Sequence, residues 1–400
     1  MIAYFFKIPG FFLPYIGCRK YFLDFWGRCC IVFLNVIYKY GGREFEIPMK
    51  VAGTSPNVRQ CNCNLVKWFL LSNGSATKPE IAEATGISLM TVGKIVNAML
   101  EEGTLLRSGL RESGLGRRAE RFELDGNRSC SVSLRFRGVG VDFVAANEFG
   151  AVVREEFMPM PEGYLVAELA PKLAGFLDGL PPMRTAVAGF PAAVFGGRLH
   201  SGGLRQFRQM DVQRELDALF GIPVWMGRDL NLATVGYSRR GLAPMALETP
   251  ELQDITCFLL DPAGHGAGCM AGGRVLRGAD FFAGEVGRMP LPGGRCIRDL
   301  VADDVPDEEY IAGVAYLLGA VTCTVNPRIA IFSGRSVRPA LLPEIDRRLR
   351  QRIGFHWEGE GNVCPELVWE PDIWPFYRAG MVYRATRRLH SGVQMVDDVF

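Results

Sequence analysis

A chain of 400 residues is longer than a single small core requires, so we expect two or three domains. About half of the residues are apolar (48%), 22% are charged, and the net charge of +2 excludes a protein drawn to nucleic acid by its overall charge. Contact with nucleic acid would therefore need a local basic patch. Eleven cysteines without a repeating spacing favour reduced thiols in the cytoplasm over a disulfide framework.

Residues 1–52 form an atypical apolar extension, rich in Phe, Tyr and Ile and interrupted by prolines. Its longest clean apolar run, Cys29 to Leu34, is far shorter than the roughly 20 residues that a membrane-spanning helix needs. Three interpretations remain open: an over-extended reading frame whose natural start is Met49, a helix on a membrane surface, and a real but poorly packed extension. Composition favours the over-extended frame.

Residues 53–127 begin with a pattern typical of three short helices. The spacing of Cys63, Val66 and Leu70 predicts a first helix from about Val58 to a Ser-Asn-Gly stop. Thr77 is followed three residues later by Glu80, a capping box that begins a second, short helix ending at Gly86. In this second helix Pro79 stands in the first turn, and we expect Ile81 and Ala84 to face inward.

Ser88 is in position to cap a third helix, which carries one apolar stripe made of Val92, Ile95, Val96 and Met99. Two helices joined by a tight glycine turn are typical of a helix-turn-helix, whose second helix enters the major groove of DNA. The polar face of the third helix would then meet phosphates and base edges.

Two strand-like runs between Thr104 and Phe122 flank a Gly-rich tip, which predicts a wing. The wing carries two glutamates and five arginines, namely Arg107, Arg111, Arg117, Arg118 and Arg121. Such a basic tip suits the minor groove or the phosphates. We therefore predict a winged helix-turn-helix that contacts DNA through Ser88, Met90, Thr91, Lys94, Asn97, Arg117 and Arg118.

Residues 128–400 alternate strands with helices, which predicts an α/β domain. Three strands in a meander come first, followed by an amphipathic helix over residues 164–180 and further strand–helix pairs. Gly-rich turns between a strand and a helix are common ligand sites in such domains.

From about Asn57 to the C-terminus the chain resembles the ROK group of repressors and sugar kinases, mainly in three stretches: IPVWMGRDLNLATVGYSRRG, LLDPAGHGAGCMAGGRVLRGADFFAGEVGR and NPRIAIFSG. The resemblance implies a two-lobed, actin-like ATPase fold for residues 128–400. The winged helix-turn-helix resembles the regulator branch of this group.

The chain departs from the kinase pattern of this group. The Asp-x-Gly-Gly-Thr loop, whose carboxylate handles the metal-bound nucleotide, is replaced by Arg135-Phe136-Arg137-Gly138-Val139. The second phosphate loop persists as Gly264-His265-Gly266-Ala267-Gly268, for which a tight turn is the favoured interpretation. We therefore expect no kinase activity and no nucleotide cofactor.

Two carboxylates of the family's sugar site persist beside new arginines. Asp229 matches the family's catalytic base but follows Arg228 instead of Asn, and Glu285 is followed by Arg288 where the family has a zinc-binding His. Cys296 alone remains of the family's cysteine cluster, so we expect no metal. Carboxylates suit sugar hydroxyls and guanidinium groups suit anions, which predicts a ligand site made of Arg228, Asp229, Glu285 and Arg288 for a carbohydrate-type, acidic or phosphorylated effector. The alternative is that each arginine pairs with a neighbouring carboxylate in an empty pocket.

The sequence thus favours a cytoplasmic transcriptional regulator, most simply a repressor, that binds a palindromic operator as a homodimer or higher oligomer and has no membrane span. The alternatives are an ATP-dependent sugar kinase with an accessory DNA-binding domain and the inactive product of a decaying gene.

Overall fold

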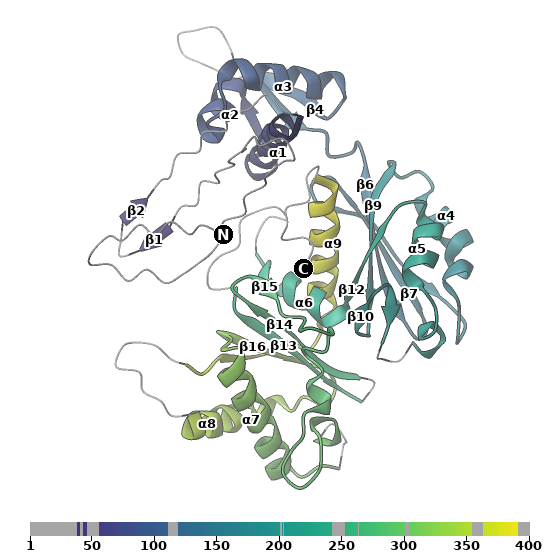
Figure 1. The fold of residues 1–400 in the computed structure, drawn as a ribbon, viewed down its shortest axis with the longest axis vertical. Coiled ribbons are helices and arrows are strands. Elements are labelled where there is room, and N and C mark those ends of the chain that lie inside the picture. Colours follow the sequence, from purple (N-terminus) through teal and green to yellow (C-terminus); the bar gives the residue numbers. More distant parts are fainter. Residues whose placement is uncertain are drawn as a thin grey trace, which may run out of the picture.

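The computed structural model describes residues 38–40, 43–45, 56–110, 119–200, 202, 204–241, 253–262, 264–300, 304–353 and 363–390. Residues 38–45 contribute a short antiparallel hairpin of β1 (Tyr38–Tyr40) and β2 (Arg43–Phe45). The remaining elements form a small helical unit and two five-stranded sheets (Figure 1). The expectations for residues 1–37, for a start at Met49 and for the wing tip with Arg111, Arg117 and Arg118 fall outside the described residues.

The small unit comprises three helices and a three-stranded sheet in the order β3-β5-β4. Its elements are α1 (Pro56–Asn73), β3 (Ser75–Thr77), α2 (Lys78–Thr85), α3 (Leu89–Glu101), β4 (Leu105–Leu110) and β5 (Glu120–Leu124). The expected stripe of α3 is completely buried and packs against Val66, Leu70, Ile81 and Phe122. The short strand β3, which pairs with β5, was not predicted.

The predicted helix caps of this unit are confirmed. Thr77 accepts a hydrogen bond from the N–H of Glu80, and the Glu80 carboxylate accepts one from the N–H of Thr77. Ser88 caps α3 by accepting from the N–H of Thr91. The prediction that Ala84 faces inward was wrong. Helix α2 is only eight residues long, Ala84 is exposed, and Ala82 packs against the core instead.

The first lobe is built on a sheet with strand order β12-β9-β6-β7-β8. Its strands are β6 (Cys130–Arg137), β7 (Gly140–Asn147), β8 (Val152–Pro159), β9 (Met183–Phe190) and β12 (Val224–Arg228). The predicted meander β6-β7-β8 is confirmed, and β9 and β12 run parallel to β6. A small hairpin, β10 (Val194–Phe195) with β11 (Arg198–Leu199), follows β9.

Helices cover both faces of this first sheet (Figure 1). One face packs against α4 (Ala170–Leu177) and α5 (Val212–Phe220), and the other against α9 (Trp374–His390). The helix predicted over residues 164–180 is shorter than expected, because a 3₁₀ turn at Val166–Leu169 precedes α4, which carries a proline in its first turn.

The second lobe has the strand order β15-β14-β13-β16-β17. Its strands are β13 (Ile255–Asp261), β14 (Gly264–Ala271), β15 (Arg274–Val275), β16 (Ile329–Ser333) and β17 (Glu366–Trp369). Its outer face packs against α7 (Asp307–Thr324) and α8 (Leu342–Ile353), and its inner face contacts α6 (Asp229–Ser238).

The tight turn expected at residues 264–268 was wrong, because these residues are the first part of β14, paired antiparallel with β13. Their glycines serve close packing. A Cβ at Gly268 would lie 2.2 Å from the carbonyl oxygen of Leu230, so only glycine lets α6 approach this strand so closely.

Helices α6 and α9 lie against each other between the two sheets (Figure 1). They meet at two glycines. A Cβ at Gly236 would lie 1.7 Å from the carbonyl oxygen of Phe376, and a Cβ at Gly380 would lie 1.8 Å from that of Leu232. The two backbones therefore touch directly, and the helix pair forms a stiff connection between the lobes.

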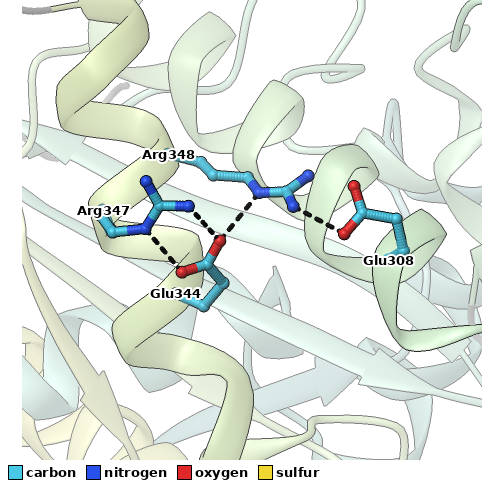
Figure 2. A network of polar contacts seen from close by, with 4 residues as sticks. All are labelled: Glu308, Glu344, Arg347 and Arg348. Atoms are coloured by element: carbon cyan, nitrogen blue, oxygen red, sulfur yellow. Dashed lines mark hydrogen bonds and ion pairs between the residues drawn. The ribbon is translucent and has the colours of Figure 1, made fainter.

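Arg348 attaches α8 to α7 on the outer face of the second lobe (Figure 2). Glu344 accepts from Arg347 and Arg348, and these hydrogen bonds lower the pKa of the Glu344 carboxyl to about 2. Arg348 also donates to Glu308 at the start of α7, over 2.6 Å. The network lies on the side of the sheet opposite α6 and takes no part in the site described below.

Across the described part of the chain, no helix combines the length and apolar character needed to cross a membrane. The eight cysteines within the described residues carry free thiols, as expected.

Candidate functional site

The predicted ligand-site residues come together where β12 ends and α6 begins. Arg228 is only 8% exposed, and its Nη2 lies 3.1 Å from Oε1 of Glu285. The same guanidinium donates to the carbonyl oxygens of Ala283 (3.0 Å) and Gly284 (3.3 Å). Arg228 therefore holds residues 283–285 of the second lobe against the edge of the first.

Asp229 is the first residue of α6 and lies next to this contact. Its carboxylate accepts a hydrogen bond of 2.6 Å from the N–H of Leu230. Burial raises the pKa of Asp229, and the positive charge of Arg228 opposes that rise only in part. A buried carboxyl group with a raised pKa is suited to take up a proton or to bind a hydroxyl group.

Arg288, the fourth predicted residue, is much more open to solvent. Its side chain is 60% exposed, and its Nε lies 4.0 Å from Oε2 of Glu285. Glu285 thus has a buried arginine on one side and an exposed arginine on the other. For Arg228, the contacts match the alternative in which the arginine pairs with a neighbouring carboxylate.

The hairpin of β6 and β7 carries residues 135–139, which the sequence analysis matched to a phosphate loop. Arg135 stands opposite Asp142 in the strand register, with Nη1 3.9 Å from the carboxylate, and Arg137 lies 3.5 Å from the other oxygen. The Arg135 guanidinium also lies 4.6 Å from the ring centre of Trp374 on α9. Burial raises the pKa of Asp142, against the effect of the two arginines. Sequence reasoning missed Asp142, which places a carboxylate one strand later than the family pattern.

The residues at the family's zinc position do not fit that metal. Arg288 is a cation where a neutral His would be needed, and Cys296 has no second thiol beside it. Among the described residues, no group of three His, Cys, Asp or Glu side chains is placed to hold a metal ion.

A pocket opens beside Arg228, between residues of both lobes. It is lined by Ala193, Val194, Trp225, Met226, Gly227, Arg228, Asn231, Arg277 and Phe281. At its edge the ring of Phe195, on the hairpin of the first lobe, lies 5.2 Å from that of Phe281, on a loop of the second. Sequence reasoning missed Trp225, Asn231 and Arg277. They lie inside the stretches that carry the family resemblance, but outside the short motifs weighed for chemistry.

The predicted DNA-contacting residues of α3 share its solvent-facing side. Ser88, Met90, Lys94 and Asn97 are exposed, Met90 at 73%, while Thr91 is half-buried. Three of their polar groups have partners within the unit, and one of these is the Thr91 hydroxyl, which lies 2.9 Å from that of Ser88. The Ser88 hydroxyl caps the helix, and the Asn97 amide oxygen accepts from Nζ of Lys78 over 2.9 Å.

The described arginines of the predicted wing are paired within the protein. Arg107 lies 2.8 Å from Glu120, and Arg121 contacts Glu80 and the backbone and side chain of Ser75. These two residues therefore contribute less free positive charge than the sequence count suggested.

The comparisons with known proteins find named repressors and, among solved structures, ROK proteins. No family model matches the chain. Over 253 residues it is 23% identical to the xylose repressor of Caldicellulosiruptor bescii, covering 60% of this chain and 61% of that one. Over 251 residues it is 21% identical to the xylose repressor of Bacillus subtilis, covering 58% and 61%. The predicted resemblance to the ROK family is confirmed. The chain thus spans about 61% of the length of these relatives.

Solved structures show the same fold. A ROK family transcriptional regulator, a homologue of the Escherichia coli MLC protein, matches 86% of this chain and 99% of its own with a TM-score of 0.63 at 14% identity. The ROK hexokinase of Thermus thermophilus matches 66% of this chain and all of its own with a TM-score of 0.50 at 18% identity. The two lobes therefore have the actin-like ROK sugar-kinase fold.

Proposed function

We propose that the chain is a sequence-specific transcriptional repressor, in which a winged helix-turn-helix binds operator DNA and the ROK body senses a carbohydrate-type ligand. The observation that carries this proposal is the exposed polar face of α3, on a capped helix directly after a glycine turn. The relatives named xylose repressors support it.

Helix α3 has the properties of a recognition helix. Its buried stripe fixes one side on the core, so the opposite side faces outward with Met90, Lys94 and Asn97. The Lys78 contact fixes the orientation of the Asn97 amide, and a fixed amide is suited to read an adenine edge. Lys94 makes no recorded contact within the described part of the chain and would supply charge for a phosphate or a guanine.

The ROK body would sense a ligand without phosphorylating it. In the first phosphate hairpin, the position of the kinase carboxylate holds Arg135, whose guanidinium lies against Trp374 and Asp142. A cation in this place cannot hold magnesium against the phosphates of a nucleotide. Asp229, by contrast, which begins α6, is the residue that the sequence matches to the family's catalytic base. A sugar kinase with an accessory DNA-binding domain is therefore the second candidate, and its test is sugar-dependent ATP turnover.

Helix α9 would connect ligand binding in the ROK body with DNA binding by the winged helix-turn-helix. Near its start, burial raises the pKa of the Tyr377 hydroxyl, and the negative charge of Asp229 raises it further. Near its end, the Arg387 guanidinium lies 5.7 Å from the ring centre of Trp68 on α1. A ligand that shifts the lobes would move α9 and, with it, the DNA-binding unit. A coupling of about 1–3 kcal/mol changes operator affinity about 5- to 150-fold.

Selection of bound duplexes from a random DNA library tests this function directly. The full chain should enrich a palindrome whose half-sites lie about one helical turn apart, as expected for a symmetric dimer. Lys94→Ala and Arg117→Ala should each weaken binding. Arg205→Ala, which removes an exposed charge from the body of the first lobe, should not. Folded protein that enriches no sequence, or that binds equally well after Lys94→Ala, would refute the proposal.

A further inference from the structure

The pocket between the lobes has a cationic lining. Two of its nine lining residues are arginines, Arg228 and Arg277, and none is acidic. Arg228 directs its guanidinium toward Glu285 and two backbone carbonyls. Among the described residues, the guanidinium group of Arg277 makes only ring contacts: its central carbon lies 5.9 Å from the ring centre of Trp225 and 5.7 Å from that of Phe281. The donors of Arg277 are therefore the ones a ligand could use.

A third guanidinium lies near the ring of Trp225. Arg384 of α9 lies 5.0 Å from the same Trp225 ring. Burial lowers the pKa of Arg277, and the charge of Arg384 lowers it further. Two like charges held together at a half-buried site repel each other, and an anion bound between or beside them would relieve that repulsion.

The rest of the lining suits a hydroxylated ligand. Asn231 Oδ1 is buried and accepts no hydrogen bond within the described structure, so it can accept one from a ligand hydroxyl. Trp225 and Phe281 offer flat apolar faces, on which the C–H face of a sugar ring can stack.

We propose that this pocket binds an anionic carbohydrate, whose carboxylate or phosphate is held by Arg277 and whose hydroxyl groups are bound at Asn231. This inference rests on the proposed function, because it names the effector class of the same body. It differs from the sequence-based site in two respects: the anion is held by Arg277, while Arg228 has a structural role, and the hydroxyl groups are bound at Asn231.

The test measures ligand binding to the full chain by calorimetry and by thermal shift. The probes are glucuronate and glucose 6-phosphate, which separate a carboxylate ligand from a phosphate ligand, and glucose and xylose as neutral sugars. At least one anionic sugar should bind and raise the melting temperature, while the neutral sugars should bind far more weakly. Arg277→Gln should weaken the anion's Kd by about 10- to 100-fold, the usual effect of a lost charge-assisted hydrogen bond.

Two further variants keep the result interpretable. Arg277→Gln removes a repelled charge, so the ligand-free melting temperature should stay the same or rise. Asn231→Asp keeps the side-chain shape and adds a negative charge, so it should also weaken anion binding at least tenfold, whereas Arg205→Gln should leave it unchanged.

Binding of neutral sugars alone, no binding by any probe, or loss of anion binding in Arg288→Gln but not in Arg277→Gln would overturn the inference. Operator binding by the ligand-free protein is measured separately. A chain that enriches a palindrome but binds no anionic sugar disproves this inference alone, and a chain that binds the anion but no DNA disproves the proposed function.

Discussion

The contact between Arg228 and Glu285 yields the sharpest prediction for stability. Both side chains are nearly buried, 8% and 13% exposed, and two backbone carbonyls accept from the same guanidinium. Arg228→Met would remove the buried guanidinium from the Glu285 carboxylate and the side-chain donor from the carbonyl oxygen of Ala283, while the carbonyl oxygen of Gly284 would keep the N–H of Ala267. Breaking a buried ion pair in this way costs about 3–5 kcal/mol of unfolding free energy. Arg288 lies 4.0 Å from Glu285 and could recover part of this loss.

The assay is urea unfolding of the full chain followed by circular dichroism. Arg228→Met should lower the midpoint strongly, and adding Glu285→Gln should restore much of the loss, because the unpaired charge is then gone. Arg347→Met breaks an exposed pair on α8 and should leave the midpoint almost unchanged (Figure 2). If Arg228→Met unfolds at the wild-type midpoint, the guanidinium does not hold the lobes together, and its sequence-based role as a ligand contact becomes the better one.

Three further predictions concern the helices. Gly380→Ala should cost at least about 2 kcal/mol of unfolding free energy, because its Cβ would lie 1.8 Å from a backbone oxygen. The control is Gly319→Ala on α7, whose Cβ would lie 3.8 Å from its nearest neighbour and which should gain up to about 1 kcal/mol. Similar urea unfolding midpoints for the two variants would contradict the close crossing of α6 and α9. Asp229→Asn should stabilise the protein at neutral pH. Burial raises the pKa of Asp229 in the folded state, so wild-type stability falls as the pH rises above the unfolded value near 4, and the advantage of the variant should vanish in acid; a pH-independent difference would contradict this. Thr77→Ala should cost about 1 kcal/mol by removing the cap of α2, and an unchanged unfolding midpoint would argue against that cap.

Local signals predicted the helical unit well, because caps and stripes depend on neighbours in sequence. The Thr77–Glu80 box and the buried side of α3 could be read directly. Strand β3 could not, because a three-residue strand has no periodicity and forms only by pairing with β5, more than 40 residues away. The prediction for residues 264–268 was wrong for a related reason. Closely spaced glycines suggest a turn, yet here these residues pair with β13 in a strand, and their glycines allow the close approach of α6.

Sequence analysis predicted four residues that lie together in the structure, but it did not predict which arginine contacts other groups of the protein. Family motifs led to Arg228, Asp229, Glu285 and Arg288, and the structure brings these four together. Which arginine is engaged by the protein and which is available depends on tertiary contacts, such as the two carbonyls that accept from Arg228. The place of Arg277 could not be predicted from the sequence either, because only the fold brings it beside Trp225 and Arg384.

The two glycines at the crossing of α6 and α9 connect the site with the DNA-binding unit. Helix α6 begins at Asp229, and the 17 residues of α9 span about 25 Å at 1.5 Å per residue. Because the backbones of the two helices touch, a shift of α6 at the pocket cannot be absorbed by side chains between them and must move α9. At the far end of α9, His390 is buried and lies 2.7 Å from the carbonyl oxygen of Glu148, close to where Arg387 meets α1. If the proposed function is correct, this arrangement gives ligand binding a short, rigid path to the helices that we propose to bind DNA.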